Sequence, residues 1–144
     1  MSSAPVVSGL IVKIIPNDRN NPPGKLADAE LHFDGIRDLR DWLSGYMNTC
    51  QNPNAFGPLM TTLWHLQALD GLKLIGFGIW ERRAAGGRNV TFPARQYSVN
   101  GERRSFALLR PILDTTAQDR IRELILDAYA EYEAQAANTE GVGR

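Results

Sequence analysis

The residues with the most evident chemistry are arginines that gather around one predicted turn, Asn100-Gly101. They are Arg82, Arg83, Arg88, Arg95, Arg103, Arg104 and Arg110, and only Glu81 and Glu102 oppose them locally. Guanidinium groups bind phosphate through paired N–H donors. The chain has 144 residues and a formal net charge of zero, so this is a local excess of positive charge. A local cluster of positive charge predicts an anionic ligand, even though the net charge of the chain is zero.

Aromatic residues alternate with these arginines if the turn sets the strand register. A two-residue turn at Asn100-Gly101 places Arg95 opposite Phe106 and Tyr97 opposite Arg104 on one face. Arginines for phosphates and rings for stacking are what a nucleic-acid-binding surface needs. Two alternatives stay open. A bulge at Pro93 would exchange the faces, and arginines beside rings are often only a solvated surface.

The elements that must position these residues follow from hydrophobic periodicity. Residues 6–15 are rich in β-branched side chains, residues 26–33 and 71–80 alternate apolar and polar positions, and residues 88–99 and 102–110 flank the turn. The glycines of the 71–80 strand predict a bend or a close approach by another backbone. The side chains on the hairpin face that carries Ala94 and Gln96 are small and apolar enough for a helix to pack on them.

The sequence predicts a helical segment over residues 34–68. Apolar spacing from Ile36 to Met47, behind a possible Asp34 cap, indicates an amphipathic helix, whereas residues 58–69 fit a helix or a strand. The segment is unusually rich in large side chains, which predicts either added core, the interpretation that we favour, or a partner-binding patch. They are Trp42, Tyr46, Phe56, Met60 and Trp64.

A C-terminal helix begins at Thr115 or Thr116, where Thr116 with Asp119, or Thr115 with Gln118, gives a capping arrangement. Its expected apolar stripe comprises Ile121, Leu124, Ile125, Ala128 and Tyr132. The rest of this helix is acidic, which makes it a poor candidate for a DNA groove and predicts that it covers the sheet. Residues 136–144 are expected to form a flexible tail.

Catalytic patterns are weak, so we expect no enzyme and no cofactor. His32 and His65 are far apart in sequence, and neither a phosphate-binding loop nor a serine or cysteine nucleophile motif is present. Cys50 is the only cysteine, which excludes an intrachain disulfide and a cysteine-based zinc site. We therefore expect no metal site.

Several runs of residues resemble the stage V sporulation protein G (SpoVG) family. They are Asn89-Val-Thr-Phe-Pro-Ala-Arg-Gln-Tyr, then Asn100-Gly-Glu-Arg-Arg, Leu109-Arg-Pro-Ile and Ile121-Arg-Glu-Leu-Ile-Leu-Asp-Ala-Tyr129. Arg110 stands where that family usually has histidine, and residues 34–68 would be an insertion. The resemblance implies a small dimeric regulator that binds DNA or RNA, with Arg95, Arg103 and Arg104 at the matching basic positions.

Together these patterns predict an α+β fold: a twisted antiparallel sheet of about five strands, the helical insertion 34–68, and a C-terminal helix packed on one face. Residues 1–135 are expected to form a single domain. The start of the chain lacks the pattern of a signal peptide and no segment has the composition of a membrane span, so we expect a cytoplasmic protein without membrane contact. We expect a nucleic-acid-binding homodimer; the alternative is a protein-interaction module that uses the aromatic residues within 42–64.

Overall fold

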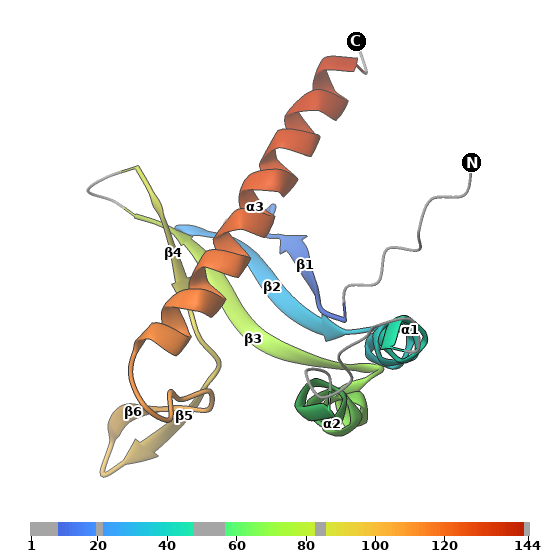
Figure 1. Cartoon of the computed structure of the whole chain (residues 1–144). Helices are drawn as coiled ribbons and strands as arrows, with labels where there is room; N and C mark the ends of the chain where they lie inside the picture. Colours follow the sequence, from blue (N-terminus) through green and yellow to red (C-terminus); the bar gives the residue numbers. More distant parts are fainter. Residues whose placement is uncertain (1–8, 20–21, 48–56, 83–85, 143–144) are drawn as a thin grey trace. The chain divides into compact units, whose positions relative to one another are not determined.

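The computed structural model describes residues 9–19, 22–47, 57–82 and 86–142, and it confirms the α+β class (Figure 1). The strands are antiparallel: β1 (Ile11–Pro16), β2 (Lys25–Phe33), β3 (Leu72–Glu81), β4 (Arg88–Thr91), β5 (Ala94–Val99) and β6 (Glu102–Ala107). The helices are α1 (Ile36–Met47), α2 (Gly57–Leu66) with the short 3₁₀ turn η2 (Gln67–Leu69), and α3 (Thr116–Val142).

The strands form two sheets where about five strands in one sheet were expected. β1, β2, β3 and β4 are neighbours in that order, and β5 and β6 form a separate two-stranded sheet. The prediction that residues 88–99 form one continuous strand is therefore wrong. Pro93 lacks a backbone N–H and separates β4, which pairs with β3, from β5. The expected close approach occurs here, since a β-carbon on Gly76 would lie 3.1 Å from the Pro93 Cβ.

The chain divides into two compact units. One contains residues 1–11 and 31–74, and the other contains residues 12–30 and 75–144. The divisions fall within β1, β2 and β3, so these three strands contribute to both units. The helical segment 34–68 belongs to the first unit, and the predicted basic hairpin belongs to the second.

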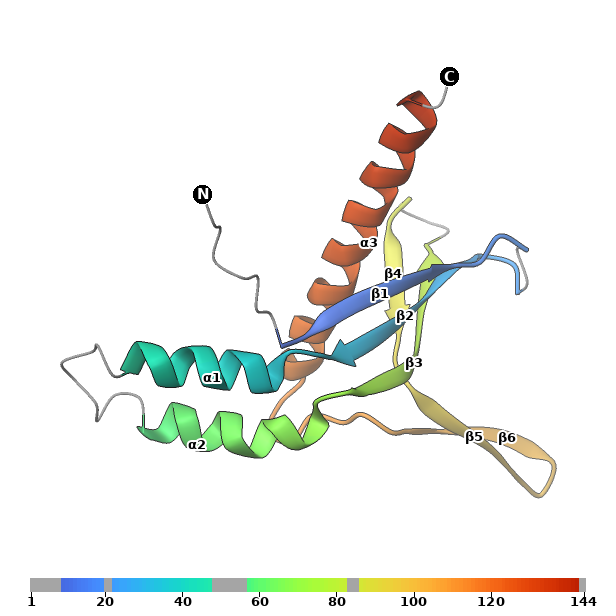
Figure 2. The same cartoon turned by 90° about the vertical axis from the view of Figure 1, so that its right-hand side faces the viewer.

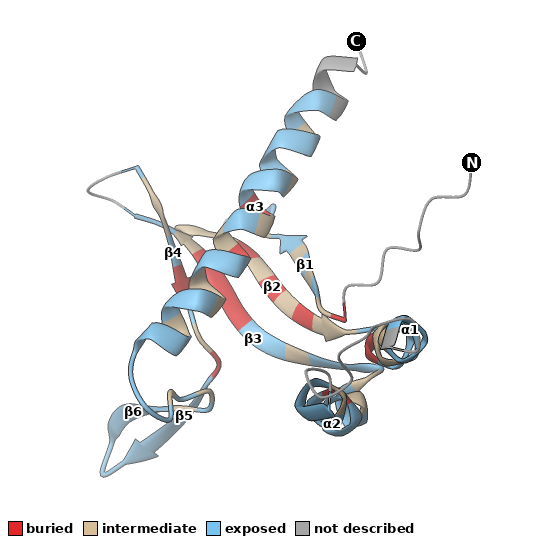
Figure 3. Ribbon diagram, in the orientation of Figure 1, coloured by how far each residue is buried: buried red, intermediate tan, exposed pale blue. Residues whose placement is uncertain are grey.

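The second unit has a core between its part of the sheet and α3, which confirms that the C-terminal helix packs on one sheet face (Figures 1 and 3). Its buried apolar side chains are Ala27, Ala29, Phe77, Ile79, Val90, Ile125 and Tyr129. The expected apolar stripe of α3 needs one correction. Leu124 is exposed whereas Tyr129 is buried, because the buried positions of the helix are centred on Ile125 and the next turn.

The start of α3 also differs from the expected capping arrangement. The Asp114 carboxylate accepts hydrogen bonds from the Thr116 backbone N–H, at 3.0 Å, and from its hydroxyl. Thr115 contributes its carbonyl, which accepts from the N–H groups of Gln118 and Asp119. An aspartate satisfies the exposed N–H groups of a helix start and suits its positive dipole end. At its other end the helix continues to Val142, through much of the segment expected as a tail.

In the first unit, α1 and α2 lie side by side (Figure 2). Residues 58–69 are helical, so the strand alternative is excluded. Ile36 and Leu63 are buried. The N-terminus of α1 is capped from a distance, since the Ile36 N–H donates to Asp70 Oδ1 at 3.1 Å, where Asp34 was expected to serve. No helix in the described part of the chain has the length and apolar character to cross a membrane.

Candidate functional site

The β5–β6 hairpin has the register that the turn residues predict. Val99 pairs with Glu102, Tyr97 with Arg104, and Arg95 with Phe106. Asn100 and Gly101 have φ values of 53° and 83°, as a turn with two left-handed central residues requires. Because this turn matches the twist of the strands, it fixes which side chains share a face.

One hairpin face alternates cations with rings. Arg95, Tyr97, Arg104 and Phe106, together with Arg110, form what we call the arginine–aromatic face. Tyr97 is 40% exposed and Phe106 is 46% exposed, and Figure 3 shows both strands as exposed. Side chains directly opposite in an antiparallel pair lie close enough to act together. The face therefore presents two neighbouring pairs of side chains, and each pair consists of a guanidinium group beside an aromatic ring.

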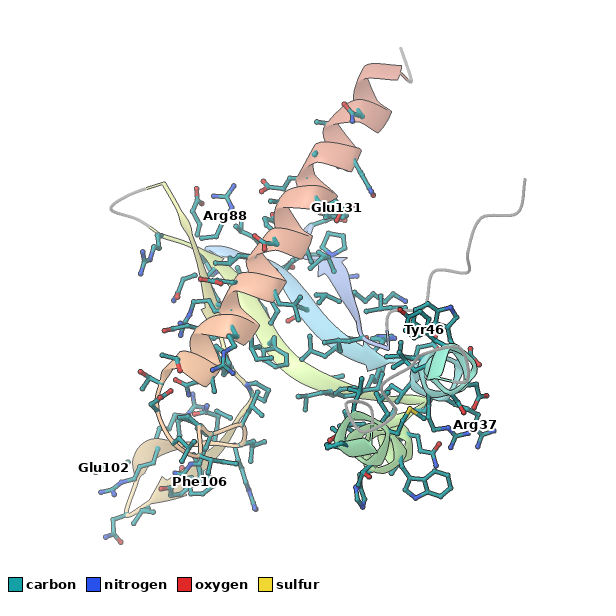
Figure 4. All side chains as sticks on the ribbon, in the orientation of Figure 1. Arg37, Tyr46, Arg88, Glu102, Phe106 and Glu131 are labelled. Atoms are coloured by element: carbon teal, nitrogen blue, oxygen red, sulfur yellow. The ribbon has the colours of Figure 1, made fainter. Side chains whose placement is uncertain are left out.

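Arg110 joins this face from the segment after β6. Its guanidinium carbon lies 4.2 Å from the centroid of the Phe106 ring, which is labelled in Figure 4. The chain is held alongside the hairpin there because the Leu108 N–H donates to the Pro93 carbonyl at 2.9 Å. Stacking on a ring orients a guanidinium without using its N–H donors, so Arg110 keeps donors for an anion.

The acid within the hairpin weakens this positive surface only slightly. Glu102 Oε2 lies 3.5 Å from Arg104 Nη2, and both side chains are more than half exposed. An ion pair in that setting contributes little and is easily exchanged for another partner. Arg104 can thus release Glu102 when a phosphate approaches.

Arg103 lies on the opposite hairpin face, where it pairs with Ser98. This second face also carries Ala94, Gln96 and Ser105, and the Gln96 amide donates to the Ser105 hydroxyl at 3.2 Å. We expected a helix to pack here, and that prediction is wrong. The break at Pro93 places the hairpin in its own sheet, so these side chains are exposed while α3 contacts β4.

Arg88 has a structural setting away from the hairpin. Its Nη2 lies 3.1 Å from Glu133 Oε2, and its guanidinium carbon lies 5.9 Å from the Tyr129 ring centroid. Arg88 is labelled in Figure 4. The hydrogen bond that Arg88 donates to Glu133 raises the pKa of Arg88 above its ordinary value, and its buried Nε atom has no hydrogen-bond partner among the described residues. Arg88 thus links β4 to α3, and Glu133 already neutralises its charge.

Of the two remaining predicted arginines, the structure describes Arg82, which lies away from the hairpin. The Arg82 backbone N–H donates to the Gly87 carbonyl at 2.9 Å, and its side chain lines a recess beside Trp80. Arg83 falls outside the described residues. The structure therefore groups Arg95, Tyr97, Arg104 and Arg110, adds Phe106 as a full member, and separates Arg82, Arg88 and Arg103 from them.

A recess that the sequence did not lead us to expect lies at the end of β3. About 550 Å³ of open space is bounded by Pro23, Gly24, Trp80, Glu81, Arg82 and Gly86. The sequence of β3 could have indicated this recess. Side chains alternate along a strand, so Trp80 lies on the same side as Gly76 and Gly78. A large ring that alternates with glycines lies against bare backbone, and such an arrangement often borders a hollow.

The large side chains of the helical segment are mostly at the surface, so the prediction that they extend the core is wrong. Trp42, Tyr46 and Trp64 are at least half exposed. Trp42 and Tyr46 stack with centroids 5.9 Å apart, and Arg40 lies 5.1 Å from the Trp64 centroid. Met60 is partly buried, and Phe56 lies outside the described residues. The buried side chain of α2 is instead Leu63.

No three His, Cys, Asp or Glu residues within the described ranges gather where they could hold a metal ion. Comparison with known proteins gives no match: no family model, no curated protein and no solved structure is similar to this chain.

Proposed function

We propose that the protein binds nucleic acid, DNA or RNA, without catalysis, through the arginine–aromatic face. The observation that carries this proposal is the pairing of Arg95 with Phe106 and of Tyr97 with Arg104 on an exposed face. Guanidinium groups meet the backbone phosphates, and the rings stack on bases. Since stacking requires accessible base faces, single-stranded segments are the ligands that fit best.

The resemblance of the hairpin and the following segment to SpoVG proteins is consistent with this proposal, and we extend it to a regulatory role. A regulator of this kind acts in the cytoplasm, where the nucleic acid is. Because contacts to phosphate carry no sequence information, the face explains affinity better than it explains the choice of a target sequence.

We further propose that a second copy of the chain covers part of the hairpin. A two-stranded sheet has two open edges and is only marginally stable by itself in water. Ile112 and Leu113, in the segment after β6, are 96% and 95% exposed, which is unusual for neighbouring aliphatic side chains. Analytical ultracentrifugation should show a dimer, and a monomer at micromolar concentration would refute this part of the proposal.

Neighbouring arginines on opposite hairpin faces provide a matched test of the main proposal. Arg104→Glu and Arg103→Glu change the net charge equally, but only Arg104 lies on the arginine–aromatic face. We expect Arg104→Glu to weaken binding of a labelled single-stranded oligonucleotide at least about tenfold, or about 1.4 kcal/mol. Arg103→Glu should have a clearly smaller effect, and equal effects would show that overall charge, not this face, determines affinity.

The second candidate function is protein binding through the exposed side chains of α1 and α2. Trp42, Tyr46 and Trp64 are the type of residue that dominates protein interfaces, and each is at least half exposed. If Arg104→Glu leaves oligonucleotide binding unchanged, this surface becomes the better candidate. Replacing Trp42 and Trp64 with alanine should leave oligonucleotide binding intact under the main proposal.

A further inference from the structure

The recess beside Trp80 lies at one end of the sheet, between the turn before β2 and the end of β3. Its walls are Pro23, Gly24, Trp80, Glu81, Arg82 and Gly86, around about 550 Å³ of open space. Small-ligand sites in proteins have volumes of roughly 300 to 1,000 Å³. The recess is therefore large enough for a single small molecule or one unit of a polymer.

The indole of Trp80 is held in a fixed position by its own strand and by β4. Its Nε1–H donates to the Thr91 hydroxyl at 2.9 Å, and Thr91 is the cross-strand partner of Gly78. A β-carbon on Gly78 would lie 2.8 Å from Nε1, so only glycine leaves room for the ring there. A ring whose orientation is set before binding loses little entropy when a ligand stacks on it.

The sheet separates this ring from α3. Residues 79 and 81 pair with residues 90 and 88, whose side chains face α3, so Trp80 projects from the other face. Backbone hydrogen bonds connect the walls of the recess: Glu81 N–H donates to the Gly24 carbonyl at 2.9 Å, and Lys25 N–H donates to the Pro22 carbonyl at 3.2 Å. Hydrogen bonds between backbone groups therefore hold the walls of the recess together.

The charges around the ring fit a ligand with both a flat base and an anion. Lys25 Nζ lies 5.8 Å from the Trp80 centroid, and its other neighbour is Asp28, at 2.6 Å. Arg82, directly after the end of β3, supplies a second cation to the lining of the recess. A base can stack on the indole, while its phosphate meets the two cations.

We propose that this recess binds one nucleotide, with the base on Trp80 and the phosphate at Lys25 and Arg82. The nucleotide can be free or part of a single strand, because both present the same chemistry. In the second case the inference rests on the proposed function, since the recess would then bind the same strand as the hairpin.

The indole N–H resonance of Trp80 gives a direct test. In ¹⁵N-labelled protein, titration with adenosine monophosphate or with a short oligodeoxyadenylate should shift the Trp80 signal and leave those of Trp42 and Trp64 in place. Saturation with the mononucleotide supports a site for free nucleotides, and saturation with the oligonucleotide alone supports a site for a strand. No shift of the Trp80 signal with either ligand would overturn the proposal.

Two variants complete the experiment. Trp80→Ala should weaken binding of the ligand that shifts the signal by about fivefold or more, the effect of losing one stacking partner. If that variant does not fold, Arg82→Glu tests the same site from an exposed residue, with Arg120→Glu on α3 as the charge-matched control. Equal effects of Arg82→Glu and Arg120→Glu would assign the binding to overall charge and refute the recess.

The outcome is separable from that of the main proposal. If the hairpin does not bind oligonucleotides but adenosine monophosphate still shifts the Trp80 signal, the recess is a nucleotide site and the proposed function fails. If Arg104→Glu weakens oligonucleotide binding while the Trp80 signal never moves, the proposed function stands and the recess is not part of it.

Discussion

Three arginines of this chain show how position determines the role of one residue type. Arg104 faces outward beside Tyr97, Arg103 lies on the other side of the same strand, and Arg88 joins β4 to Glu133 on α3. A strand places successive residues on opposite faces, so the separation of Arg103 from Arg104 follows from the pleat alone. The engagement of Arg88 depends on where α3 packs, which the local sequence does not determine.

Tyr129, beside Arg88, gives a prediction about pH. Burial raises the pKa of the Tyr129 phenol above its ordinary value of 10.0, and the nearby Glu133 raises it further although Arg88 opposes the shift. The folded state therefore binds this proton more tightly than the unfolded state. The resulting stability is present below about pH 10 and is lost as the pH rises through the folded pKa.

We expect the free energy of unfolding of the wild-type protein to fall more steeply above about pH 10 than that of Tyr129→Phe. Urea unfolding of both proteins near neutral pH and above that value measures the difference. Other groups titrate in the same range, but they are common to both proteins and cancel in the comparison. Parallel loss of stability in the two proteins would contradict the assigned role of Tyr129.

The hairpin and the sheet are separate elements because of one residue, Pro93. Hydrophobic alternation continues from β4 into β5, so a pattern of period two predicts a single strand over 88–99. The turn residues Asn100-Gly101 nevertheless determine the register of β5 with β6 correctly, because that pairing is local. The alternation does not determine that β4 pairs with β3 while β5 pairs with β6, because strand pairing depends on contacts between residues distant in sequence.

Two adjacent residues of α3 differ sharply in burial. Leu124 and Ile125 are adjacent aliphatic residues, yet Ile125 is fully buried and Leu124 is 38% exposed. Ile125→Ala should destabilise the protein by about 2 to 5 kcal/mol, because it leaves a cavity between α3 and the sheet. Leu124→Ala should cost less than about 1 kcal/mol.

Thermal or urea unfolding of the two alanine variants makes this comparison with matched chemistry. If both substitutions destabilised the protein equally, the face that α3 presents to the sheet would be different from the one described. Sequence periodicity places both residues in one apolar stripe, so only the packing distinguishes them.

At the scale of the whole molecule, the order of the elements could be predicted from the sequence, and the surfaces less well. The α+β class, the helical segment 34–68 and the C-terminal helix follow from periodicity and turn residues. The exposure of Trp42 and Trp64 and the recess at Trp80 do not, because composition alone gives large aromatic side chains a strong bias toward the core.

Charge is also a property of the whole molecule. The formal net charge is zero, so electrostatic attraction of nucleic acid must come from a local surface. The arginine–aromatic face contains three arginines, Arg95, Arg104 and Arg110, whose ionic neighbours on the hairpin are limited to the weakly held Glu102. Binding that depends on three phosphate contacts has a definite salt dependence.

Fluorescence anisotropy of a labelled single-stranded oligonucleotide, titrated with the protein over a range of salt concentrations, measures that dependence. The account predicts that the logarithm of the association constant falls linearly with the logarithm of the salt concentration, with a slope of about −2 for three neutralised phosphates. The absolute slope should decrease in Arg104→Glu and change less in Arg103→Glu. Absence of binding at low salt, or binding that salt does not weaken, would contradict the claim that this face binds nucleic acid.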